Sequence, residues 1–193
     1  MNKQTFEIID GVYVGPEVWG GALDLHGYKE TLTSLGSLTK VGGYLDLKGC
    51  TNLTSLGSLK EVGSWVDLRS CISLRSLGTL KEVGSFLWLS GCTNLVSLDP
   101  LKEVKGNLYL FGCINLTSLG SPIKVGGFFF LKDYVWSMNT YTSPQDILDK
   151  VLYYSSLPLH EALNALHIDE VQRVPLYKNI LLKSLQGGGI SSL

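Results

Sequence analysis

The sequence predicts a mainly β protein, a parallel-stranded solenoid of about six coils followed by a C-terminal α-helical segment. Three observations predict this class. An apolar skeleton repeats every 21 residues between Gly20 and Leu131, as in solenoid proteins. Each copy contains one short stretch that alternates apolar and polar residues, as a strand does. Beyond residue 132 the period ends and helix signals begin. We therefore expect a strand cap at 1–18, the solenoid at 19–132 and a helical cap or docking segment at 133–193.

The composition describes an ordinary soluble chain. It has 193 residues, 45% of them apolar, and a net charge of −1, which gives no indication of a nucleic-acid or acidic-membrane partner. The N-terminus lacks the features of a signal peptide, and no apolar run is long enough for a membrane span. We expect a cytoplasmic protein.

The first residues predict a small hairpin. An apolar-leaning stretch at 5–9 is followed by Asp10-Gly11, which is typical of a turn, and by Val12-Tyr13-Val14, which Gly15 and Pro16 end. Terminal repeats otherwise expose their core, so we expect this hairpin to cover the first coil.

Each repeat predicts one strand and several corners. In one copy Val66 and Leu68 face inward while Asp67 faces outward, and Gly63-Ser64 supplies a tight turn before them. After the strand an apolar residue recurs at every third position, which suits a coil with one inward residue at each corner. These residues are Cys71, Leu74, Leu77, Leu80 and then Val83. Such a coil is too short to hold a strand and a full helix.

The four cysteines, Cys50, Cys71, Cys92 and Cys113, occupy the same position in successive copies. In stacked coils they form a ladder with a spacing of about 4.8 Å and point the same way into the core. Disulfides and zinc sites need side chains that converge. We therefore expect free buried thiols, no metal and a reducing compartment.

Residues 47–56, LKGCTNLTSL, resemble the leucine-rich-repeat family, particularly its bacterial repeats with a GCxxLxSL pattern. The pattern recurs at 91–98 and 112–119. The resemblance implies a parallel-stranded solenoid whose strand face binds other proteins. Some bacterial members carry a C-terminal ubiquitin ligase with a nucleophilic cysteine, but this C-terminal segment contains no cysteine.

No other pattern indicates an enzyme. His160-Glu161 and His167 lack a paired nucleophile or a metal-ligand spacing, and no phosphate-binding loop is present. We expect no catalytic residue and no cofactor.

The C-terminal segment shows three helix patterns. Ser143-Pro144-Gln145-Asp146 is a helix start with a cap, a first-turn proline and an acid. Apolar residues on one face predict helices near 147–152, 159–166 and 175–185. They could seal the last coil, dock a partner or mediate oligomerisation.

The outward residues of the strands form three columns, which together we call the strand face. The first holds Ala22, Tyr44, Trp65, Phe86, Asn107 and Phe128; the middle Asp24, Asp46, Asp67, Trp88, Tyr109 and Phe130; the last His26, Lys48, Arg69, Ser90, Phe111 and Lys132. Early coils are therefore charged and later coils aromatic. Exposed aromatic patches are uncommon on soluble monomers without a partner, although aromatic ladders also stabilise sheets and the C-terminal helices could cover them.

The column of aspartates places like charges on neighbouring strands, which is unfavourable. We expect Lys48 and Arg69 to compensate it; a bound calcium or a catalytic acid pair is the alternative.

The hypothesis from sequence is a non-enzymatic module, from a bacterial or phage-encoded effector or inhibitor, that binds another protein. The expected binding residues are Tyr44, Asp46, Lys48, Trp65, Asp67, Arg69, Phe86, Trp88, Tyr109, Phe111, Phe128 and Phe130. The alternative is a solenoid that binds or cleaves carbohydrate. Self-association through the aromatic residues or the helical segment also stays open.

Overall fold

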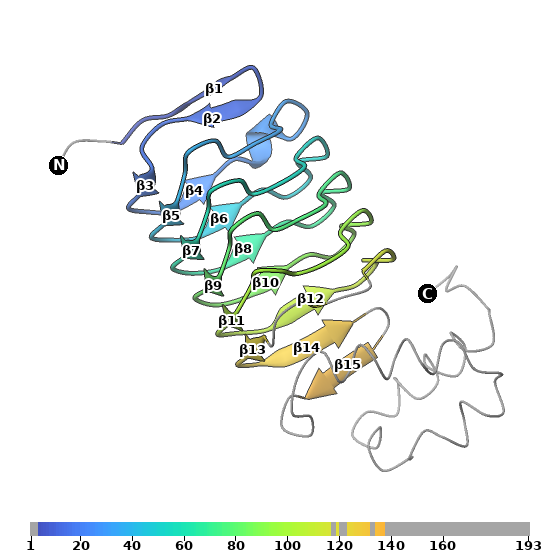
Figure 1. Ribbon diagram of the computed structural model, residues 1–193. Coiled ribbons are helices and arrows are strands. Elements are labelled where there is room, and N and C mark those ends of the chain that lie inside the picture. The colour runs from blue at the N-terminus through green and yellow to red at the C-terminus, as the bar shows by residue number, and fades with distance from the viewer. Residues whose placement is uncertain (1–3, 117–118, 120–122, 132–133, 138–193) are drawn as a thin grey trace, which may run out of the picture.

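The structure, a computed structural model, describes residues 4–116, 119, 123–131 and 134–137. The described chain winds into a solenoid whose coils stack from the N-terminal hairpin to the last strand (Figure 1). Six parallel strands are stacked on the strand face and enclose about five turns. The predicted mainly β solenoid is confirmed, with about five turns rather than about six.

The first sheet carries the strand face and follows the predicted register. Its strands are β4 (Leu23–Asp24), β6 (Leu45–Asp46), β8 (Val66–Asp67), β10 (Leu87–Trp88), β12 (Leu108–Leu110) and β14 (Phe128–Leu131), all parallel, with β15 (Tyr134–Ser137) antiparallel to β14. Asp46 pairs with Asp24 on one side and Asp67 on the other. Equivalent residues of successive copies therefore lie side by side.

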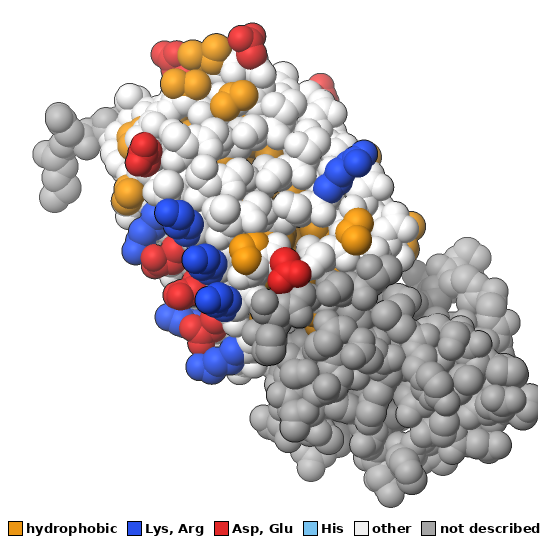
Figure 2. All heavy atoms as spheres, in the orientation of Figure 1, with side chains coloured by type: hydrophobic (Ala, Val, Ile, Leu, Met, Phe, Trp, Pro, Cys, Tyr) orange, Lys and Arg blue, Asp and Glu red, His pale blue; other side chains and the backbone are white. Residues whose placement is uncertain are grey.

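A second parallel sheet lines another side of the coils and was not predicted. It consists of β3 (Val18–Trp19), β5 (Lys40–Val41), β7 (Glu61–Val62), β9 (Glu82–Val83), β11 (Glu103–Val104) and β13 (Lys124–Val125). The second residue of each strand of this sheet from β5 to β13 is a valine that points inward, and the polar residues before these valines form ion pairs such as Lys40–Glu61 and Lys124–Glu103, each at 2.9 Å. Figure 2 shows these charges as a band of blue and red side chains along this sheet.

Corners on the third side are fixed by serine and glycine. Ser34, Ser55 and Ser76 are joined by isolated bridges, and the Ser76 hydroxyl accepts a hydrogen bond from the Gly78 amide at 2.9 Å. Gly78 has a φ of 62°, and a Cβ there would lie 2.5 Å from the carbonyl oxygen of Gly57 in the preceding coil. Glycine is required because the backbones approach closely in a left-handed conformation.

The predicted N-terminal strands and turn are present as β1 (Glu7–Ile9) and β2 (Val12–Val14), which pair antiparallel. Asp10 and Gly11 have φ values of 49° and 79°, the positive pair of a tight hairpin turn. Tyr13 is 1% exposed, and its amide donates to the Ser34 carbonyl at 3.0 Å. The hairpin thus continues the stacking and covers the first coil.

One hydrophobic core runs through the described coils, and the cysteines lie in it as predicted. All four are free and buried. The Cys71 thiol donates to the Leu47 carbonyl of the preceding coil at 3.2 Å. Burial raises the pKa of Cys71 to about 12, so the thiol stays protonated and unreactive at neutral pH.

The segment at 133–193 begins with a strand. The first helix was expected to start only at Ser143; before it, Tyr134–Ser137 form β15, a strand that was not predicted and that pairs antiparallel with β14. The helices expected near 147–152, 159–166 and 175–185 lie outside the described residues. Among the described residues the one helix is the 3₁₀ turn η1 (His26–Tyr28). No helix in this part of the chain has the length and apolar character needed to cross a membrane.

The buried thiols lead to a direct prediction. Native protein should react with a thiol reagent at mildly alkaline pH only as fast as it unfolds, because the thiols are buried and their pKa is raised. Reaction with dithiobis-nitrobenzoate, followed by absorbance, checks this. In concentrated guanidinium chloride all four thiols should react at once. Rapid stoichiometric labelling of native protein would contradict the buried ladder.

Candidate functional site

The aromatic residues of the strand face form one continuous surface, which we call the aromatic ribbon. Its members are Tyr44, Trp65, Phe86, Trp88, Tyr109, Phe111, Phe128 and Phe130, each within ring-contact distance of at least one other. They come from strands β6 to β14 or from the residues beside them. The repeat places them together because each coil adds residues to the same columns.

Three of the seven ring contacts within the ribbon are stacked, and the other four are edge-to-face or tilted. The Tyr44 and Trp65 rings lie 4.2 Å apart and nearly parallel, at 2°. Tyr109 and Phe130 stack at 4.4 Å and 11°. Trp88 stacks on Tyr109 at 5.8 Å but meets Trp65 edge to face. The sheet-stabilising ladder that the sequence left open as an interpretation is therefore present.

Some of the ribbon remains accessible to solvent. Phe86 is 37% exposed and Phe128 is 51% exposed, whereas Trp65, Trp88 and Tyr109 are half-buried by their neighbours. Asn107, which interrupts the first column, donates through its amide nitrogen to the Tyr109 hydroxyl at 2.8 Å. Its amide oxygen accepts from the backbone of Phe128, also at 2.8 Å. The polar interruption is therefore satisfied within the face.

The three aspartates of the middle column share a local motif that sequence reasoning missed. Each carboxylate accepts a hydrogen bond from the backbone amide two residues later. The distances are 3.1 Å from His26 to Asp24, 3.0 Å from Lys48 to Asp46 and 2.9 Å from Arg69 to Asp67. Aspartate at the end of a short strand was the available signal, because this residue type favours such turns.

Arg69 compensates Asp67, as predicted. Its Nε lies 3.0 and 2.9 Å from the two carboxylate oxygens, and its guanidinium carbon lies 5.7 Å from the Trp88 ring centroid. Asp67 is consequently only 3% exposed. The strand face offers the guanidinium and the indole to solvent at this position, with the carboxylate beneath them.

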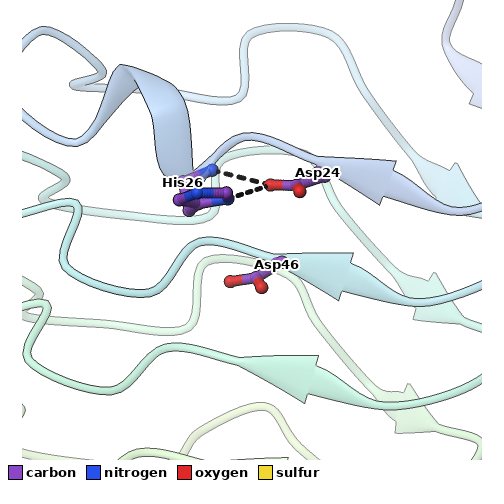
Figure 3. A group of neighbouring side chains, drawn as sticks. All are labelled: Asp24, His26 and Asp46. Carbon is purple, nitrogen blue, oxygen red and sulfur yellow. Dashed lines mark hydrogen bonds and ion pairs between the residues drawn. The ribbon is translucent and has the colours of Figure 1, made fainter.

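The expected compensation by Lys48 is not observed. Its backbone amide bonds to Asp46, but its ammonium forms no ion pair with any described residue. The first coil uses His26 instead, whose Nδ1 lies 2.6 Å from an Asp24 oxygen (Figure 3). The hydrogen bond to Asp24 raises the pKa of His26. The charged end of the strand face thus contains two different ion pairs and one carboxylate, Asp46, without a cation.

The Asp67–Arg69 pair predicts an effect on stability. Arg69→Met leaves a buried carboxylate without its cation, and should lower the free energy of unfolding by about 1–3 kcal/mol. Lys48→Met in the preceding coil is the matched control and should change it by less than about 0.5 kcal/mol. Urea denaturation measures both. Equal effects of the two variants would contradict a structural role for the pair.

Comparisons of the chain with protein-family models, with curated proteins and with solved structures find no match. Function is therefore argued from the geometry of the strand face.

Proposed function

We propose that this chain is a non-enzymatic binding module of the leucine-rich-repeat type that binds another protein through its strand face. The observation that carries the proposal is the continuous aromatic ribbon, which includes exposed rings at Phe86 and Phe128. The ribbon lies on a sheet whose parallel strands keep neighbouring ring centroids between 4.2 and 6.1 Å apart. We place binding at the ribbon and at the charged residues beside it.

The ribbon has the properties of a preorganised contact surface. Stacked rings such as Tyr44 and Trp65 have little side-chain freedom left to lose, which lowers the entropic cost of association. Tyrosine, tryptophan and arginine are also the residue types that dominate binding energy in protein interfaces. Arg69, held beside the Trp88 ring with its side chain 44% exposed, adds a cationic group next to this apolar surface.

The charged residues divide into two kinds. Asp67 is buried beneath Arg69, so we assign it to positioning Arg69 rather than to contacting the partner. Lys48 is exposed and Asp46 is half-buried. In this proposal Lys48, Arg69 and Asp46 set the orientation of the partner, because charges beside an apolar centre favour one register over others.

A protein partner fits the ring geometry better than a carbohydrate. Aromatic residues bind sugars through their flat faces, but Tyr44 and Trp65 cover one another, as do Tyr109 and Phe130. Stacking covers one face of each of these rings, and Tyr109 also stacks on Trp88, so ring edges form much of the surface open to a ligand. Edges and neighbouring apolar side chains suit the irregular surface of a protein. The free, buried thiols are also consistent with work in a reducing compartment such as the cytoplasm.

The proposal is tested by substitutions that change the ribbon at its exposed rings and spare the stacked ones. Phe86→Lys should abolish capture of a specific protein from a bacterial lysate, and should weaken binding of the purified partner by at least about 30-fold, as expected of an interface anchor. Val96→Lys is the matched control, since Val96 is an exposed apolar residue, 51% accessible, outside the three columns of the strand face. Isothermal titration with the purified partner gives the affinities.

Two results would contradict the proposal. One is a partner that binds Phe86→Lys as tightly as the wild type. The other is loss of binding in Val96→Lys alone, which would place the site on another side of the coil. Light scattering on each variant separates a foreign partner from a second copy of this chain, because self-association through the ribbon would change the measured mass.

A further inference from the structure

The first two coils bring a mixed set of metal-ligating groups together at the charged end of the strand face. Asp24 and Asp46 are paired in register on β4 and β6, and His26 begins the 3₁₀ turn that follows β4. Figure 3 shows the imidazole and the two carboxylates gathered at the ends of these strands. One ligand atom from each residue lies within 4.8 Å of the others.

The first coil differs from the next two in the residue that follows the strand aspartate by two positions. The position two residues after the strand aspartate is Lys48 in the second coil and Arg69 in the third, both permanent cations. The Arg69 guanidinium neutralises Asp67. In the first coil the same position is His26, whose neutral imidazole is a metal ligand rather than a fixed charge. The ion pairs of the described residues give Asp46 no cation, so two neighbouring carboxylates face one imidazole.

We propose that Asp24, His26 and Asp46 bind a divalent transition-metal ion, with zinc as the best match. Zinc accepts both imidazole nitrogen and carboxylate oxygen as ligands, whereas calcium takes six to eight oxygens and no nitrogen ligand is typical of it. The ion supplies the positive charge that Asp46 lacks. It also replaces the hydrogen bond between His26 and Asp24 with two bonds to the metal, while water occupies the remaining coordination positions.

The geometry allows this with side-chain movement alone. Zinc bonds to nitrogen and oxygen are about 2.0–2.2 Å long, which places tetrahedral ligands about 3.3–3.6 Å apart. The His26 Nδ1–Asp24 distance is 2.6 Å and the ligand atoms all lie within 4.8 Å of one another, so small side-chain shifts reach this spacing. The side chains of His26 and Asp24 are 61% and 48% exposed, so both can rotate. Lys29, which follows η1, is the nearby positive charge that opposes binding.

The site shares Asp46 with the charged residues assigned to partner binding, but none of its ligands belongs to the aromatic ribbon, and zinc titration tests it without a protein partner. A bound ion would tie β4, β6 and η1 together and so stiffen the first coils. It would also leave an open coordination position at the surface, as three-ligand sites do.

Isothermal titration of zinc chloride into the metal-stripped full chain tests the inference. Wild type should bind one equivalent, and His26→Gln and Asp46→Asn should each weaken binding at least about tenfold. Lys48→Gln changes the equivalent position of the next coil, which donates no ligand, and should keep wild-type affinity or exceed it. Zinc should also raise the melting temperature of wild type and Lys48→Gln, but not that of the two ligand variants.

Three results would overturn the inference. They are no saturable zinc binding by wild type, affinities that His26→Gln and Asp46→Asn leave unchanged, and tighter binding of calcium than of zinc. Circular dichroism of each variant checks that lost binding does not come from lost folding. Asp46→Asn keeps the oxygen that accepts the Lys48 amide, so its fold should be preserved.

Discussion

Backbone hydrogen bonding from each coil to the next is the interaction on which the rest of this structure depends. The amide of Leu45 donates to the Trp65 carbonyl at 3.0 Å, and the amide of Val66 repeats the bond to Phe86 at 2.9 Å. Most strands contain only two residues, so no coil can satisfy its own backbone. Stacking supplies the partners, and it does so only at an offset of one repeat. That offset fixes which side chains meet throughout the molecule.

The same offset determines the character of the surface. Inside the coils it stacks leucines, valines and cysteines into one hydrophobic core. On the outer surface, the same offset places every strand residue next to its equivalent in the next coil. This favours aromatic rings, which can stack, and disfavours aspartates, which repel one another. The aromatic half of the strand face resolves this by stacking. The charged half resolves it with Arg69 in one coil and His26 in another, and leaves Asp46 as the position where a cation is missing.

Much of the fold could be predicted because inward-facing residues recur at the same position of each 21-residue repeat. The inward positions, the buried thiols and the parallel strands of the strand face follow from residues such as Val66 and Cys71 that recur in phase. The second sheet was missed because its residues, such as Lys60-Glu61-Val62, show no apolar–polar alternation, whereas Val66-Asp67-Leu68 on the strand face does. The strand β15 lies outside the repeat, so no period could indicate it. Its antiparallel pairing depends on the free edge of β14, a tertiary feature.

For the strand face, only the columns of outward-facing residues could be predicted. Sequence alternation gives the order of rings and charges along the strand face, but not which of them touch. Burial of Asp67 depends on Arg69 lying between the carboxylate and the Trp88 ring, which is a choice of side-chain conformation. The same applies to His26, which pairs with the aspartate of its own coil while Lys48 does not pair with Asp46. These side-chain conformations depend on contacts with residues of adjacent coils, which the sequence does not specify.

Deletion of one complete repeat tests the central claim most directly. Removing residues 62–82 joins Glu61 to Val83 and keeps every remaining column in phase, since Val83 takes the place of Val62. The account predicts a shorter solenoid that still unfolds cooperatively. Its free energy of unfolding should depend less steeply on urea concentration, because less surface is buried. Removing only residues 62–72 should prevent folding, because it misaligns all later coils. A folded protein from the second deletion, or an unfolded one from the first, would contradict the account.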